Sequence, residues 1–153
     1  MKESLKLAIL QLRTELDRGT TMEKARRMLR EAAEQGAEMA MLPEMFNCPY
    51  AGRYFRDFAA QGHEETVEAL SEMARENRIW LVGGSVPERE GEKLYNSCFI
   101  YDDRGGLAAR HRKIHLFDID APGMRFRESK TFTPGQEITV FDTQLINFCL
   151  NNI

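Results

Sequence analysis

The sequence predicts an α/β protein built on a mixed β-sheet, with helices on one face of the sheet. Two amphipathic helical stretches, at about residues 20–36 and 64–77, alternate with three short apolar runs that read as buried strands. Two further strand-like runs then follow each other directly, as in a hairpin. This order is typical of a sheet that combines parallel and antiparallel neighbours. Because one helix layer covers only one face, we expect apolar side chains to be exposed on the other.

The elements of the first third follow from local patterns. Residues 5–12 form an apolar run and predict the first strand. The segment TTME at 20–23 has the form of a capping box, which predicts that the first helix begins at its first threonine, Thr20. Gly36 supplies the stop signal of that helix. The apolar run at 39–42, closed by Pro43, predicts the second strand.

The rest of the chain shows the same two periodicities, 3.6 residues for helices and two for strands. In order, the sequence predicts a loop at 47–62, a helix at 64–77, a strand at 79–85, a hairpin of strands at 94–101 and 107–113, an irregular segment at 114–136, and a last strand at 138–141.

Composition narrows the class of protein. The chain has 153 residues, 42% hydrophobic and 29% charged, enough for one domain with its own core. The net charge of −3 gives no reason to expect a nucleic-acid partner. No apolar run approaches the ~18–20 residues that span a bilayer, so we expect no membrane partner. The segment after Met1 has no cleavage-site pattern, and we expect no signal peptide.

The cysteines and histidines predict neither disulfides nor a metal site. Cys48, Cys98 and Cys149 are widely spaced, which is unlike a disulfide framework or a zinc site and fits a reducing cytoplasm. His111 and His115 are four apart but lie in a predicted strand, where that spacing does not bring side chains together. The Gly-Gly pair at 83–84 lacks the frame of a phosphate loop, so no nucleotide or other cofactor is expected.

Glu44 is the first candidate for chemistry. It directly follows the predicted strand at 39–42, and ligands of open α/β sheets bind outside the carboxyl ends of strands. A carboxylate there can serve as a general base. The alternative is a solvated loop glutamate.

The densest basic stretch, at 110–115, holds the second candidate. Strand alternation sends Arg110 and Arg112 to one face, and His111 and Lys113 to the other. Lys113, at a strand end, can stabilise a developing oxyanion. The stretch also fits a basic edge that discourages strand pairing, which composition alone favours, or a phosphate-binding patch. Glu128 by itself reads as a loop carboxylate paired with an arginine or lysine.

Taken together, the motifs resemble those of the nitrilase superfamily of carbon–nitrogen hydrolases, most closely its omega-amidase branch. The resemblance covers residues 5–143 and rests on LPEMF at 42–46, NCPY at 47–50, LVGGS at 81–85, LYNS at 94–97, HRKIHLFDID at 111–120, ESKT at 128–131 and TPG at 133–135. It implies a four-layer αββα sandwich of which this chain holds the first half, and a family that is usually homodimeric.

The resemblance also implies a Glu-Lys-Cys mechanism. It makes Glu44 the general base, Lys113 the oxyanion-stabilising cation and Glu128 an accessory carboxylate. The expected reaction releases ammonia from a small dicarboxylate monoamide through a thioester. The alternatives are a carbamoyl or other amide substrate, or an inactive fragment that binds a full-length homologue or nothing at all.

The family pattern is lost after Thr143, so residues 144–153 form a divergent segment. Family members continue with a glycine-containing turn and an apolar strand ending in Cys-Tyr-Asp, about ten residues past the threonine. Here Cys149 comes about four residues early and is followed by Leu150. We therefore expect Cys149 to be an ordinary buried thiol, the nucleophile to be unknown, and this chain to be inactive by itself.

Overall fold

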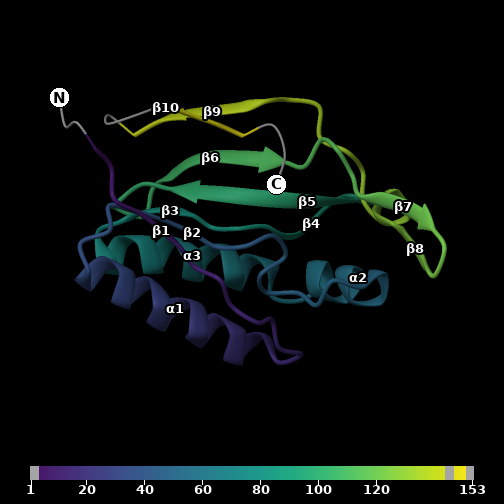
Figure 1. The fold of residues 1–153 in the computed structure, drawn as a ribbon, viewed down its shortest axis with the longest axis horizontal. Helices are drawn as coiled ribbons and strands as arrows, with labels where there is room; N and C mark the ends of the chain where they lie inside the picture. Colours follow the sequence, from purple (N-terminus) through teal and green to yellow (C-terminus); the bar gives the residue numbers. More distant parts are fainter. Residues whose placement is uncertain (1–3, 144–146, 151–153) are drawn as a thin grey trace.

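A six-stranded mixed sheet forms the centre of the molecule (Figure 1). The computed structural model describes residues 4–143 and 147–150. The strands of the sheet are β1 (Leu7–Ile9), β2 (Met39–Met41), β3 (Trp80–Val82), β4 (Val86–Glu90), β5 (Lys93–Tyr101) and β6 (Leu107–Arg112). Strands β1, β2 and β3 are parallel neighbours, while β5 runs antiparallel to β3, β4 and β6. The predicted mixed sheet is confirmed.

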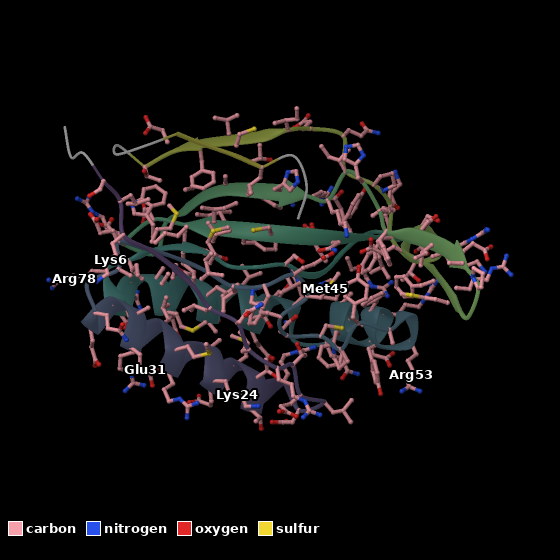
Figure 2. All side chains as sticks on the ribbon, in the orientation of Figure 1. Lys6, Lys24, Glu31, Met45, Arg53 and Arg78 are labelled. Atoms are coloured by element: carbon pink, nitrogen blue, oxygen red, sulfur yellow. The ribbon has the colours of Figure 1, made fainter. Side chains whose placement is uncertain are left out.

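Two helices cover one face of this sheet. They are α1 (Arg18–Glu34) and α3 (His63–Asn77), and both lie on the same side of the strands in Figure 1. Ala25 and Leu29 of α1 and Leu70 of α3 pack with Leu81 and Phe99 of the sheet into one buried cluster. The outer side of α1 is polar, and Figure 2 shows Lys24 and Glu31 projecting from it away from the sheet.

The start of α1 differs from the prediction. The cap is Asp17, whose carboxylate accepts a hydrogen bond from the Thr20 amide at 2.7 Å, so the helix begins at Arg18. Aspartate is at least as good an N-cap as threonine, and it lies three residues before Thr20. Thr21 is buried instead, and its hydroxyl accepts from the Glu15 amide. The predicted stop is confirmed, since Gly36 follows the helix with a φ of +80°.

Several elements were missed because their sequences are polar or short. Helix α2 (Gly52–Ala60) lies in the predicted loop and has no side-chain N-cap; Phe55 and Ala59 are its buried residues. Strand β4 contains Pro87 and the charged Glu88, which weaken a strand prediction. The predicted irregular segment contains the hairpin β7 (Asp118–Ala121) and β8 (Met124–Arg127) and the 3₁₀ turn η1 (Glu128–Lys130).

The second face of the sheet is not bare. Strands β9 (Thr139–Asp142) and β10 (Asn147–Leu150) form an antiparallel ribbon that lies over it, on the side opposite the helices (Figure 1). Phe141 of the ribbon packs against Val82, Cys98 and Ile100. The expectation of an uncovered face is therefore wrong in this region. Ile9 and Val140 are nevertheless exposed, at 75% and 64%.

In the described part of the chain, no helix combines the length and the apolar character that crossing a membrane requires.

Candidate active site

Lys113 lies at the centre of a buried charged cluster. Its Nζ atom is 2.7 Å from Glu44 Oε1 and 3.0 Å from Glu128 Oε2. The side chain of Glu128 is fully buried, that of Lys113 is 4% exposed, and that of Glu44 is 30% exposed. The structure thus brings together all three residues that the sequence singled out, although Glu44 and Lys113 are 69 residues apart in the chain.

The main chain fixes Lys113 from two sides. Its amide donates to the Asn96 carbonyl at 2.8 Å, which extends the pairing of β6 with β5 by one residue. Its carbonyl accepts from the Gly135 amide, also at 2.8 Å. A Cβ atom on Gly135 would lie 2.1 Å from the Arg112 carbonyl oxygen, so only glycine allows this approach.

The turn after β2 places Glu44. Met45 adopts a positive φ of 50°, and its amide donates to Ser85 Oγ at 3.0 Å. Gly84 has a φ of +61°, and a Cβ on it would lie 2.3 Å from the Pro43 carbonyl oxygen. The Gly-Gly pair therefore serves close backbone packing around Glu44. Figure 2 shows the buried Met45 inside the molecule, between the sheet and the helices.

Glu128 closes the base of the β7–β8 hairpin. Its amide donates to the Phe117 carbonyl at 3.1 Å, and its Oε2 accepts from the Phe117 amide at 2.6 Å. The interpretation of Glu128 as a carboxylate paired with a lysine holds, because its partner is Lys113. It is a buried residue rather than a solvated one.

Two further residues join the cluster, and neither was a sequence candidate. The Asn96 amide nitrogen donates to Glu44 Oε1 at 2.8 Å and to Glu128 Oε1 at 3.1 Å. The Tyr50 hydroxyl donates to Glu44 Oε1 at 3.4 Å. Asn96 carried a usable signal, since it is an amide within a predicted strand, two residues from Cys98 and therefore on the same face as that thiol.

The cluster keeps its lysine charged. Burial disfavours the ammonium form of Lys113, but its hydrogen bonds to Glu44 and Glu128 outweigh that effect and raise its pKa. Burial also raises the pKa of Tyr50, and the negative charges of Glu44 and Glu128 raise it further. Tyr50 therefore stays a neutral hydroxyl that can donate.

The predicted alternation along β6 is confirmed. Arg110 and Arg112 lie on the face opposite Lys113, where both contact Glu88, at 2.8 and 3.0 Å. Burial disfavours the charged form of Glu88, but its hydrogen bonds to Arg112 and Ser97 outweigh this and lower its pKa. Since both guanidinium groups are already paired with a carboxylate, the arrangement disfavours the phosphate-binding interpretation.

None of the three cysteines lies in the cluster. Cys48 and Cys98 are buried, and desolvation raises the pKa of each thiol to about 12, so both remain unreactive thiols at neutral pH. Cys149 is exposed, so its prediction as a buried thiol was wrong. The ribbon alternates, with Phe141 facing the sheet and Val140, the partner of Cys149, facing outward.

Cys149 is also too far along the ribbon. It pairs with Val140, whereas the chain meets the Lys113 backbone at Gly135, before β9 begins and five residues before Val140. Five extended residues span about 16 Å. Cys149 therefore faces away from the Lys113 ammonium, at a part of the ribbon beyond the Gly135 contact.

The histidines do not assemble a metal site. Among residues 4–143 and 147–150, no group of three or more His, Cys, Asp or Glu side chains is placed to hold a metal ion. His111 is fully buried, and its Nδ1 lies 3.0 Å from Thr139 Oγ1. Desolvation lowers the pKa of His111, so the imidazole is neutral.

Comparison with known proteins identifies the family of the chain. The family profile described as carbon-nitrogen hydrolase matches residues 6–153. The omega-amidases NIT2 of Mus musculus and Homo sapiens are each 46% identical to this chain over 141 residues. Those 141 residues are 92% of this chain and 51% of each relative, so the chain spans about half the length of the curated relatives it matches.

Solved structures of the same superfamily have the same fold as this chain. The crystal structure of Saccharomyces cerevisiae Nit3, a member of branch 10 of the nitrilase superfamily, superposes with a TM-score of 0.80 at 32% identity. The match covers 92% of this chain and 52% of that one.

Proposed function

Because the chain belongs to the carbon–nitrogen hydrolase family, we propose that residues 1–143 provide the base and the cation of an omega-amidase-like enzyme. The substrate would be a small dicarboxylate monoamide, from which the enzyme releases ammonia. The observation that carries this proposal is the buried Lys113 ammonium held between Glu44 and Glu128. The similarity to omega-amidases supports the choice of substrate class.

The cluster supplies two of the three groups that amide hydrolysis through a thioester requires. All three described contacts of Glu44 fall on Oε1, and Oε2 accepts no hydrogen bond from the part of the chain that the structure describes. Oε2 is thus available to take the thiol proton as sulfur attacks the amide carbon. The Lys113 ammonium stabilises the oxyanion that forms.

The remaining steps return the proton. As the C–N bond breaks, the protonated Glu44 gives its proton to the leaving nitrogen, and ammonia departs. Glu44 then takes a proton from the water that attacks the thioester, and the thiol is regenerated with release of the second carboxylate. Glu128, which holds Lys113 from the other side, is the accessory carboxylate.

None of the three cysteines is placed to act as the nucleophile of this site. Cys149 faces away from the cluster and Cys48 and Cys98 are buried. This favours a second proposal, that the 153-residue chain by itself has no amidase activity. In that case it would be an inactive chain, or a binding partner of a full-length homologue.

One assay tests both proposals. Ammonia release from a four- or five-carbon dicarboxylate monoamide is measured for the 153-residue chain and for a chimera. The chimera joins residues 1–143 to the remaining half of the mouse omega-amidase. We expect activity in the chimera alone. A chimera that unfolds cooperatively but releases no ammonia would contradict the enzyme proposal. Ammonia release by the original chain, abolished by Cys149→Ala, would make Cys149 the nucleophile.

We also propose a cytoplasmic location and self-association. The three free cysteines support a reducing compartment. A homodimer follows only from the family resemblance, and sedimentation of the purified chain tests it.

A further inference from the structure

The side chain of Asn96 contacts both carboxylates of the cluster, and its main chain contacts the lysine between them. Its single amide nitrogen lies 2.8 Å from Glu44 Oε1 and 3.1 Å from Glu128 Oε1. The residue is 1% exposed, and its own carbonyl accepts the Lys113 amide. One residue of β5 is therefore bonded to all three members of the cluster.

The two carboxylates determine which end of the Asn96 amide faces them. Ionised carboxylates only accept hydrogen bonds, so the nitrogen and its two hydrogens must point at Glu44 and Glu128. As a result Oδ1 is buried and has no hydrogen-bond partner among the described residues. An unpartnered buried oxygen costs stability, so the orientation is set by the carboxylates and not by the needs of Asn96 itself.

We propose that Asn96 is a positioning residue that holds Glu44 and Glu128 on opposite sides of the Lys113 ammonium. One N–H binds Oε1 of Glu44, which leaves Oε2 without a hydrogen bond from the described residues and available to act as the base. The other N–H commits Oε1 of Glu128, which leaves Oε2 for Lys113 and the Phe117 amide. The benefit to catalysis rests on the proposed function, whereas the positioning itself does not.

The Phe117 amide offers a reporter that is independent of activity. It donates to Glu128 Oε2 at 2.6 Å, so its proton chemical shift and its hydrogen exchange depend on where Glu128 is held. The Lys113 amide, which donates to the Asn96 carbonyl, reports instead on the pairing of β5 with β6. Both amides can be followed by NMR in the 17.6 kDa chain as it exists.

The test compares Asn96→Leu, which keeps the shape of the side chain but removes both donors, with the unchanged protein. We expect the Phe117 amide proton to move upfield and to exchange about 10- to 100-fold faster, the factor for loss of a hydrogen bond to a charged group. The Lys113 amide should stay within about threefold of its original rate, because the backbone pairing remains. If Asn96→Leu does not unfold cooperatively, Asn96→Ser replaces it, since serine is too short to reach both carboxylates.

Cys98→Ala is the matched control. Cys98 is buried on the same strand and the same face, two residues away, and belongs to the apolar cluster under the ribbon. It should leave the Phe117 signal unchanged. The proposal is overturned if Asn96→Leu leaves Phe117 unaffected, if it speeds exchange at Phe117 and Lys113 equally, or if Cys98→Ala has the same effect. Lack of ammonia release by the chimera would count against the proposed function alone.

Discussion

Replacing Lys113 by methionine removes the only cation that the structure shows between Glu44 and Glu128, and so tests how much the cluster depends on it. The side chain is 4% exposed and Glu128 is fully buried, so solvent cannot replace the lost charge. Removing one partner of a buried ion pair costs about 3–5 kcal/mol. Glu44 is 30% exposed and can turn toward water, which places the expected loss near the lower end.

We therefore expect Lys113→Met to lower the free energy of unfolding by about 3 kcal/mol. For a domain of this size each kcal/mol shifts the melting temperature by about 2–4 °C, so the melting temperature should fall by about 6–12 °C. Urea unfolding at pH 7, followed by circular dichroism, measures the difference. The control is Lys24→Met, because the Lys24–Glu15 pair is about one-third exposed on each side and should contribute less than about 1 kcal/mol.

The pH dependence of this difference has a definite sign. The pKa of Lys113 is raised in the folded state, so the stability it contributes is fully present below the unfolded value of about 10.4. That contribution is lost as the pH rises through the folded value. The difference in free energy of unfolding between the unchanged protein and Lys113→Met should be constant from pH 7 to about 10 and decrease above that pH. If Lys113→Met lowered the free energy of unfolding by no more than Lys24→Met does, the account of Lys113 as the buried centre of a coupled cluster would be refuted.

Three further changes test separate parts of the structure. Gly84→Ala should lower the free energy of unfolding by about 3 kcal/mol or more in urea titrations, because its Cβ meets the Pro43 oxygen at 2.3 Å and its φ is positive; a loss below about 1 kcal/mol would contradict this packing. Cys149→Ser should change stability by less than about 0.5 kcal/mol, since the thiol is exposed; a large loss would mean that it is buried. Because burial lowers the pKa of His111, its stability contribution is present above about pH 6.5 and is lost as the pH falls through the lowered value. His111→Gln should flatten the decline of the urea midpoint just below pH ~6.5, and an unchanged slope would count against a neutral buried imidazole.

The sequence predicted those features that depend on periodicity and strand ends. The layer of α1 and α3, the mixed sheet and the position of Lys113 beside β5 follow from apolar spacing and from the predicted hairpin. The family resemblance, rather than any single motif, singled out Glu128, which pattern alone reads as a loop carboxylate.

What the sequence could not predict depends on contacts between distant residues. Glu88 lies in β4, a strand that composition disfavours, and its charge is accommodated because Arg112 of β6 neutralises it across β5. Asn96 looks like an ordinary polar residue of a strand until the structure shows Glu44 and Glu128 both bound to its amide nitrogen. The outward turn of Cys149 depends on the pairing register with Val140, which a single strand sequence does not fix.

The most direct test of the proposed function is the effect of Glu44→Gln on ammonia release by the chimera that carries residues 1–143. Glutamine keeps the shape of Glu44 and can accept from Lys113, but it cannot take a proton, so we expect kcat to fall by at least about 100-fold. The matched control is Glu88→Gln, which changes another ion-paired carboxylate on the opposite face of the sheet and should leave kcat within about threefold if the protein remains folded. A Glu44→Gln chimera that unfolds cooperatively and still releases ammonia at a rate close to that of the Glu88→Gln control would contradict the assignment of Glu44 as the base.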